Sequence, residues 1–395
     1  MKTIEDYNFK DKKALIRVDF NVPIGKDGKV GDKTRIEAAK PTIIKILEDG
    51  GSVILMSHLG RPENKESKYS LKQIVGAVSE VLGVKTKFVS DSVGPEVEKA
   101  VNDLGMGEVL LLENLRYYEE ETKGEESFAK DLAKLGDIYV NDAFGTAHRA
   151  HASTTIVARY FDKKCAGYLL QKEVESLNKV LKSSEKPVTA ILGGAKVSSK
   201  ITVIENILDK VDNLIIGGGM AFTFIKAQGG SVGSSLVEDD KQVLALEILK
   251  MAERAGVQVH LPVDSVIGDS FSENAKTDIT RTDSIPDGWM GLDAGPETIE
   301  NFSKVIAESR TILWNGPVGV FEMEAFSNGT IKIGEAIGRA TAKGAYSLVG
   351  GGDSVSAVKK FGLEDQMSYV STGGGAMLEM LEGKSLPGIQ ELSKD

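Results

Sequence analysis

Cysteine is almost absent from the sequence: Cys165 is the only one in 395 residues. An intramolecular disulfide is therefore impossible, and so is a zinc site built from two or more cysteines. The N-terminal residues MKTIEDYNFKDKK lack the apolar core of a signal peptide, and no apolar run approaches the length that spans a bilayer. We therefore expect a cytoplasmic protein that has no membrane partner.

Basic residues are not in excess either. The 48 Lys and Arg residues are outnumbered by 58 Asp and Glu residues, which gives a formal net charge of −10. A protein that binds nucleic acid needs a basic field against the phosphates, so no nucleic-acid partner is expected. Any site for a small anion must come from a local cluster of Arg and Lys. The chain is 41% hydrophobic and 27% charged, which is typical of a globular protein, and its 395 residues suit two domains.

Short apolar runs alternate with helix-like stretches along the whole chain, from ALIRVDF near the start to MSYVST near the end. This alternation predicts an α/β fold with two doubly wound parallel-sheet (Rossmann-like) domains. Between the halves, apolar residues at helical spacing predict an amphipathic helix over residues 169–181, which ends before Pro187. We assign 1–170 to an N-terminal domain, 171–186 to an inter-domain helix and hinge, 187–376 to a C-terminal domain, and 377–395 to a segment that packs back on the N-terminal domain.

The apolar run at residues 16–23 carries polar residues at alternate positions. A period of two places Ile16, Val18 and Phe20 on one face and the polar side chains on the other. Those polar side chains are Arg17, Asp19 and Asn21. Taken alone, the pattern is typical of a half-exposed strand with a solvated polar face. Asp and Asn are poor strand formers, however, so their presence in this run needs another explanation.

Basic side chains follow several predicted strands of the first half, namely those at residues 53–57, 109–112 and 138–140. Parallel strands place their carboxyl ends at one edge of the sheet, where ligands bind. The residues expected to converge there are Arg35, His58, Arg61, Arg116, His148, Arg149 and His151. Guanidinium groups match phosphate and carboxylate oxygens bidentately, so the cluster favours a small phosphorylated or carboxylated molecule. A metal at His148-x-x-His151 is disfavoured, because Arg149 between the histidines would repel a cation.

Glycine clusters follow the predicted strands of the second half. They lie at residues 193–194, 217–219, 316–319, 350–352 and 373–375, mostly between a strand and a helix. Such loops bring backbone N–H groups and helix N-termini close to an anion, although tight turns alone also use glycine. Together the loops favour a nucleotide platform. The dinucleotide fingerprint fails at Phe222 and Val355, and the Walker pattern fails at Leu378, so neither a standard dehydrogenase nor a Walker-type NTPase is indicated.

An ordered series of motifs resembles the phosphoglycerate kinase family. RVDFNVP, SHLGRP, LLENLR, NDAFGTAHRAHAS, GGAKVSSK, GGGMAFTF, WNGPVGVFE, GGGDS and STGGGA follow one another from Arg17 to Ala376. Ser199 replaces the Asp usual in the family, and Ser327 replaces a common Ala; neither position is expected to bind a ligand. The resemblance implies a monomeric glycolytic enzyme with an active-site cleft between its domains. Such an enzyme reversibly transfers the acyl phosphate of 1,3-bisphosphoglycerate to ADP with Mg²⁺, which gives 3-phosphoglycerate and ATP.

The resemblance also implies roles for particular residues. The acid substrate would be held by Asp19, Asn21, Arg35, His58, Arg61, Arg116 and Arg149. The nucleotide would be held by Lys200, Gly217, Gly218, Leu292, Asn315, Glu322, Gly351, Gly352, Asp353 and Ser354. Catalysis would rest on Arg35, Lys196, Gly351 and Gly374, with Asp353 as the Mg²⁺ ligand. From the residues alone, Glu322 is equally an ordinary acid at a helix start and Asp353 a helix cap.

The implied reaction needs no covalent intermediate and no general base, because the carboxylate of 3-phosphoglycerate is already ionised at neutral pH. Catalysis would come from positioning and charge stabilisation. Domain closure involving the helix at 169–181 would bring the reacting atoms together and exclude water. Two other functions stay open from the residues alone. One is an NAD-dependent oxidoreductase, disfavoured by the missing fingerprint, and the other is a two-domain binding protein for small anions, a class that is usually exported.

Overall fold

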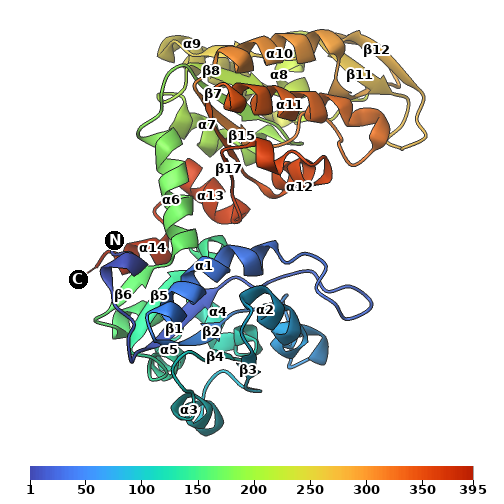
Figure 1. Ribbon diagram of the computed structural model, residues 1–395. Coiled ribbons are helices and arrows are strands. Elements are labelled where there is room, and N and C mark those ends of the chain that lie inside the picture. Colours follow the sequence, from blue (N-terminus) through green and yellow to red (C-terminus); the bar gives the residue numbers. More distant parts are fainter. Residues whose placement is uncertain (395) are drawn as a thin grey trace. The chain divides into compact units, whose positions relative to one another are not determined.

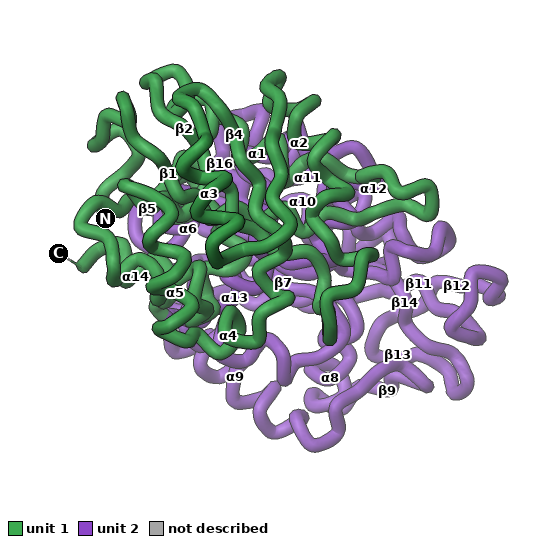
Figure 2. Tube along the Cα trace, turned by 90° about the horizontal axis from the view of Figure 1, so that it is seen from below, with its two compact units in different colours: residues 1–175, 385–395 green, residues 176–384 purple. Residues whose placement is uncertain are grey.

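The structure is a computed structural model that describes residues 1–394, which form two compact units (Figures 1 and 2). Unit 1 contains residues 1–175 and the C-terminal residues from Ser385 on, and unit 2 contains Ser176–Lys384. The division falls within helix α6 (Tyr168–Leu181), so the helix predicted over 169–181 is confirmed. Among the described residues, no helix combines the length and the apolar character needed to cross a membrane.

Unit 1 is built on a six-stranded parallel sheet in the order β3-β4-β2-β1-β5-β6. Its strands are β1 (Lys13–Val18), β2 (Ser52–Met56), β3 (Thr86–Phe88), β4 (Val109–Leu111), β5 (Ile138–Asp142) and β6 (Lys164–Ala166). The predicted strands of this half lie within one or two residues of β2, β4 and β5. Short runs of Val, Ile and Leu suit strands that are covered on both faces.

Helices of unit 1 cover both faces of this sheet. α1 (Thr34–Glu48) and α2 (Val75–Leu82) share a core with alternate residues of β1, β2 and β4. α3 (Pro95–Asn102), α4 (Glu119–Lys123) and α5 (Glu126–Ala133) belong to connections that run the opposite way along the sheet. Because parallel crossovers are right-handed, the reversal places these helices on the other face. The short C-terminal helix α14 (Pro387–Leu392) also belongs to unit 1, and the Gly388 N–H donates to the Ala147 carbonyl at 2.9 Å.

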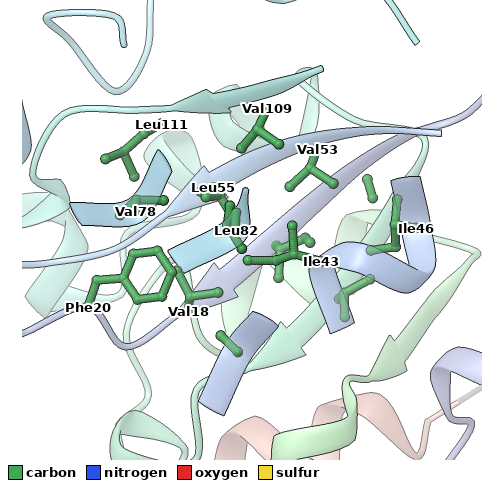
Figure 3. Close-up of a cluster of buried hydrophobic side chains, with 14 of the residues drawn as sticks. Val18, Phe20, Ile43, Ile46, Val53, Leu55, Val78, Leu82, Val109 and Leu111 are labelled. Carbon is green, nitrogen blue, oxygen red and sulfur yellow. The ribbon is translucent and has the colours of Figure 1, made fainter. Parts of the chain in front are cut away.

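Figure 3 shows the core between the sheet and helices α1 and α2. The labelled side chains are Val18, Phe20, Ile43, Ile46, Val53, Leu55, Val78, Leu82, Val109 and Leu111. All of them are at most 3% exposed. Burial of each such side chain stabilises the fold by about 1.5–3 kcal/mol. This core fixes the strand order and therefore the positions of the loops at the carboxyl ends of the strands.

β1 follows the predicted alternation, but its polar face is not solvated. Ile16 and Val18 lie in the core with α1 and α2, as expected. Arg17, on the opposite face, is nevertheless 0% exposed. The interpretation of a half-exposed strand is wrong, because a doubly wound sheet covers the second face as well. The strand ends at Val18, so Asp19 and Asn21 lie in the loop that follows.

Unit 2 is built on a second six-stranded parallel sheet, in the order β10-β8-β7-β15-β16-β17. Its strands are β7 (Val188–Leu192), β8 (Asn213–Ile216), β10 (Gln258–His260), β15 (Thr311–Asn315), β16 (Tyr346–Val349) and β17 (Tyr369–Val370). The helices are α7 (Ile201–Ile207), α8 (Met220–Ala227), α9 (Gln242–Ala255), α10 (Pro296–Glu308), α11 (Asn328–Ala342), α12 (Gly352–Lys360) and α13 (Gly374–Leu381). α10, α11 and α12 share one core with the sheet. Two doubly wound parallel sheets confirm the predicted fold class.

Two smaller sheets were not expected from the alternation of strands and helices. β11 (Asp264–Gly268) pairs antiparallel with β12 (Thr277–Arg281) and with β14 (Met290–Ala294). β9 (Ser231–Val232) pairs parallel with β13 (Ser284–Ile285). β12 is largely exposed and contains no apolar run, so hydrophobic periodicity could not reveal it.

Candidate active site

The basic cluster of unit 1 lies where the parallel strands end. Asp19 follows β1, His58 follows β2, and Arg116 lies in the short helix at Leu115–Tyr117 after β4. Arg35 comes from the first turn of α1, and Arg149 lies in the long loop after β5. Since all these strands are parallel, their carboxyl ends meet at one edge, and the side chains are gathered as predicted.

Hydrogen bonds tie the loops of this edge to one another. Arg35 Nη1 donates to Asp19 Oδ2 at 2.8 Å. Asn21 Oδ1 accepts from the Gly60 N–H, and Arg116 Nη1 donates to the Gly60 carbonyl, both at 2.8 Å. Asp19 and Asn21 therefore hold the loops that carry the cations. Arg116 Nε is buried and has no hydrogen-bond partner among the described residues, so it keeps a donor available.

Two histidines of the cluster, His58 and His151, are held neutral. Burial, followed by the charges of Arg17, Arg116 and Arg35, lowers the pKa of His58 well below its ordinary value. Burial and the same neighbouring charges of Arg17 and Arg116 lower the pKa of His151 to about 4. These electrostatic effects also show that the cations lie close together. The positive charge of the site thus comes from its arginines.

The arginines differ in exposure. Arg61 and Arg149 are exposed, whereas Arg116 is partly buried and Arg35 keeps 37% of its side chain in solvent. Burial and the charge of Arg17 lower the pKa of Arg116, although the guanidinium remains charged in the working range of an enzyme. Exposed arginines at the rim and partly buried ones below suit capture of a small, multiply charged anion.

Unit 2 contains a cavity of about 480 Å³ at the carboxyl edge of its parallel sheet. Five of the predicted nucleotide residues line it: Gly217, Gly218, Leu292, Glu322 and Asp353. The loop at Gly218 needs glycine, because its φ is +66° and a Cβ there would come within 2.7 Å of the Gly194 backbone. The absence of side chains therefore keeps this wall of the cavity open to a ligand.

The other predicted residues of unit 2 cluster around Asn315. Lys200 Nζ donates to Asn315 Oδ1, and Asn315 Nδ2 donates to the Gly350 carbonyl at 2.8 Å. Ser354 Oγ accepts from the Gly316 N–H at 2.6 Å. Burial lowers the pKa of Lys200, which the Asp353 carboxylate partly opposes.

Two helix N-termini meet beside this cluster. Gly351 precedes α12, and a Cβ on Gly374, the first residue of α13, would lie 3.2 Å from the Gly352 nitrogen. Adjacent helix N-termini present unpaired N–H groups and favour anions. Lys196 is exposed in the loop before α7. Gly352 begins α12, in which Asp353 occupies the first turn.

The residues fit a magnesium ion that arrives with a nucleotide. Among the described residues, no group of three His, Cys, Asp or Glu side chains gathers as a metal cage. Mg²⁺ usually takes one or two carboxylates and completes its shell with phosphates and water. Asp353 lines the cavity beside two helix N-termini that suit phosphates, so one carboxylate there meets this requirement.

Sequence reasoning missed several residues of both sites. Arg17 is buried beneath the basic cluster, and only its position on a strand could have pointed to it. Phe271 and Leu236 line the cavity of unit 2 although they are 63% and 49% exposed. They lie outside regular strands and helices, where apolar periodicity gives no signal. Asp293 also lines this cavity, and burial raises its pKa to about 7. Its place near the end of β14 could have revealed it.

Comparison with known proteins finds one family along nearly the whole chain. The family model for phosphoglycerate kinase matches residues 4–384. The chain is 53% identical to the phosphoglycerate kinase of Porphyromonas gingivalis, over 98% of this chain and 99% of that protein. It is 52% identical to the cytosolic phosphoglycerate kinase of Nicotiana tabacum, over 99% and 97% of the two chains. The structure of phosphoglycerate kinase from Coxiella burnetii superposes with a TM-score of 0.90 at 44% identity, covering 99% of this chain and 98% of that one.

Proposed function

This chain belongs to the phosphoglycerate kinase family, and we propose that its two anion sites divide the substrates of that enzyme between them. The chain is a glycolytic transferase with phosphoglycerate kinase activity. The basic cluster of unit 1 would hold 3-phosphoglycerate or 1,3-bisphosphoglycerate. The glycine-lined cavity of unit 2 would hold ADP or ATP with Mg²⁺. We also propose a cytoplasmic monomer, in line with the cytosolic relative from tobacco.

The acid substrate suits the edge of unit 1 because it carries a phosphate and a carboxyl group. Arg35, Arg61, Arg116 and Arg149 offer guanidinium forks, and His58 offers a neutral imidazole. Asp19 and Asn21 act chiefly by holding Arg35 and the loop at Gly60. The observation that carries the proposal is the set of arginines at one sheet edge, where Asp19 braces Arg35 and Asn21 braces the loop at Gly60.

The nucleotide suits the cavity of unit 2. The apolar wall that includes Leu292 would contact the base, Glu322 the ribose, and the region around Lys200 and Asn315 the phosphates. Asp353 would hold Mg²⁺, whose charge when bound offsets that of the phosphate oxygens. Ser354 would act indirectly, through its hydrogen bond to the Gly316 N–H.

The reaction would be a direct, in-line transfer. The attacking carboxylate of 3-phosphoglycerate is ionised at neutral pH, so no residue has to remove a proton. Arg35 from unit 1 and Lys196 from unit 2 would stabilise the charge on the moving phosphoryl group, together with N–H groups at Gly351 and Gly374. Because the substrates bind to different units, transfer requires domain closure, in which α6 would take part. Small-angle scattering should therefore detect compaction when both substrates are present.

Steady-state kinetics with both substrates tests whether the acid substrate binds to unit 1 and the nucleotide to unit 2. Arg149→Ala should raise KM for 3-phosphoglycerate by roughly 10- to 100-fold, the loss expected for a charged hydrogen bond, and leave KM for ATP unchanged. Glu322→Gln should raise KM for ATP and leave KM for 3-phosphoglycerate unchanged. Lys196→Ala should lower kcat itself. Arg254→Ala, an exposed arginine at the end of α9, is the matched control and should change nothing.

The proposal fails if Arg149→Ala and Glu322→Gln affect the same substrate. A wild type that binds both substrates without turnover would leave only the binding-protein function. The activity is followed by coupling product formation to glyceraldehyde-3-phosphate dehydrogenase and measuring the loss of NADH.

A further inference from the structure

Arg17 is a wholly buried cation beneath the basic cluster of unit 1. Its side chain is 0% exposed. No ion pair within 4 Å joins it to a carboxylate in the described part of the chain. Its guanidinium instead makes three hydrogen bonds: Nε to Ser153 Oγ at 2.8 Å, Nη1 to the Val18 carbonyl, and Nη2 to His58 Nδ1 at 3.1 Å. The family roles given above do not include Arg17.

The contact with His58 fixes which ring nitrogen carries the proton. A guanidinium has only donors, so His58 Nδ1 must accept the hydrogen bond through its lone pair. The proton of a neutral His58 must then sit on Nε2. A protonated imidazole would direct an Nδ1–H at the N–H of Arg17, which is repulsive. Asp19 Oδ1 lies 4.0 Å from Nδ1, too far to accept a hydrogen bond from it.

We propose that Arg17 is a positioning residue that locks His58 in its neutral Nε2–H tautomer, so that His58 gives the anionic substrate a hydrogen-bond donor. The inference rests on the proposed role of His58 as a substrate ligand. His58 is only 3% exposed. Without a defined tautomer, its Nε2 would offer the substrate a hydrogen-bond donor in one tautomer and an acceptor in the other. A fixed tautomer avoids reorganisation when the substrate arrives.

Arg17 is itself held by a buried network. Ser153 Oγ accepts from Arg17 Nε and donates to Glu121 Oε1 at 2.6 Å, while the Ser153 N–H donates to Glu121 Oε2 at 2.9 Å. Ser153 and Glu121 are both 0% exposed. Ser153 thus links Arg17 to the carboxylate of Glu121 through hydrogen bonds, which explains how a buried cation is tolerated without direct contact to a carboxylate.

The surroundings of His58 act in the same direction. Besides Arg17, the cations Arg116 and Arg35 lie near enough to disfavour an imidazolium, while the neighbouring His151 is itself neutral. Asp19 is the one acidic group close to the ring among the described residues, and its Oδ2 already accepts from Arg35. Burial, the first cause, together with these charges, lowers the pKa of His58 well below its ordinary value.

Nitrogen NMR of the histidine rings tests the tautomer directly. The chain has four histidines, and a His58→Gln variant assigns the signals of His58. In the uniformly ¹⁵N-labelled wild type, His58 should show an unprotonated Nδ1 and a protonated Nε2 from about pH 5.5 to about pH 8.5. A protonated Nδ1, or a titration near the ordinary pKa of 6.5, would overturn the proposal. This readout does not depend on activity.

The same spectra separate failure of the inference from failure of the proposed function. Addition of 3-phosphoglycerate should shift the Nε2–H signal of His58 without changing the tautomer. If the tautomer is as inferred but the substrate leaves Nε2–H unmoved, the assignment of His58 as a ligand is wrong while the positioning by Arg17 stands.

A pair of substitutions gives a kinetic test. The amide nitrogen of Gln can replace Nε2 of a histidine, whereas that of Asn replaces Nδ1. His58→Gln should therefore raise KM for 3-phosphoglycerate by less than about tenfold, and His58→Asn by roughly 10- to 100-fold. Equal losses, or a smaller loss in His58→Asn, would contradict the role of Nε2.

Arg17→Met removes the donor that fixes the tautomer. The His58 signals should then average between tautomers and titrate closer to the ordinary pKa. If they keep the wild-type pattern in a folded variant, Arg17 is not the cause. If Arg17→Met fails to fold, Arg17→Lys replaces it, because Lys keeps a buried donor and a positive charge. The tautomer of His58 in the wild type is decided by its own titration, without either variant.

Discussion

Asp142 places a buried carboxyl group against the start of α6. It ends β5, is 0% exposed, and its Oδ1 accepts from the Leu170 N–H at 3.1 Å. Its Oδ2 has no hydrogen-bond partner within the described residues. A Cβ on Gly167 would come within 2.2 Å of Oδ1, so the chain packs closely around this group. Burial, only partly offset by hydrogen bonds from Thr42 and from the first turn of α6, raises the pKa of Asp142 to about 7.

The raised pKa makes unit 1 sensitive to pH in a defined direction. Below the ordinary pKa of 3.8 both the folded and the unfolded chain hold the proton, and the contribution to stability is complete. As pH rises toward 7, the unfolded chain releases the proton first, and stability is lost. A rise from 3.8 to about 7 corresponds to about 4 kcal/mol, since each pKa unit is worth about 1.36 kcal/mol.

Asp142→Asn removes this titration and keeps an acceptor for the Leu170 N–H. Below about pH 3.8 the wild type and the variant should have similar free energies of unfolding, and at about pH 5, where the unfolded wild type has already released the proton, the variant should be the more stable by about 1.5–2 kcal/mol. At about pH 8 the variant should be the more stable, by up to about 4 kcal/mol. Comparison at the same pH cancels titrations elsewhere in the chain, including that of Asp293.

The chain supplies a separate probe for each unit. Cys165 is the only thiol, lies in β6 of unit 1 and is 0% exposed, so its labelling in denaturant reports unfolding of that unit. Trp289 and Trp314 are the only tryptophans and belong to unit 2, so their fluorescence reports the other unit. Asp142→Asn should move the thiol-labelling transition, with a much smaller effect on fluorescence. A pH-independent difference between the variant and the wild type would refute the reasoning.

Two further substitutions test the packing of each unit. Gly193→Ala should destabilise unit 2 by about 1–3 kcal/mol, because the added Cβ would come within 2.1 Å of the Pro317 carbonyl oxygen. It should also lower the affinity for Mg-ADP, measured by calorimetry. The control is Gly76→Ala in α2, where a Cβ meets nothing within 4 Å, and it should be neutral or stabilising. Ile43 is 0% exposed in the core between α1 and the sheet. In urea unfolding, Ile43→Ala should therefore lower the stability of unit 1 by about 2–5 kcal/mol, and Ile43→Val by about 0.5–1.5 kcal/mol. Similar losses for both variants would argue against cavity formation.

Sequence patterns located most strands because a buried parallel strand is a short apolar run with a clear end. They also predicted where the arginine cluster and the glycine loops lie, since strand ends, arginines and glycines can be read from the order of residues alone. The burial of Arg17 could not be predicted in this way, because it depends on Ser153 and Glu121, which are distant in sequence. The antiparallel strand β12 was missed because nothing apolar marks it.

The cavity walls show a second limit of sequence reasoning. Phe271 lies in an irregular segment, and its place at the cavity follows from the path of the chain between β11 and β12. No periodicity encodes such a path. The site residues inferred from the family therefore include the polar contacts and omit much of the apolar surface that a nucleotide base would meet.

The two proposed anion sites are built in different ways. Unit 1 gathers cationic side chains, braces them with Asp19 and Asn21, and keeps His58 and His151 neutral, so these two histidines should add little charge near neutral pH. Unit 2 relies more on backbone N–H groups at helix N-termini, with few side-chain charges. In a chain of net charge −10, each arrangement offers an anion a local favourable field within about one Debye length, roughly 8–10 Å. Asp293, whose pKa burial raises to about 7, would add less negative charge beside the cavity than an ordinary carboxylate. Local geometry, and not overall charge, therefore decides which anions this protein can hold.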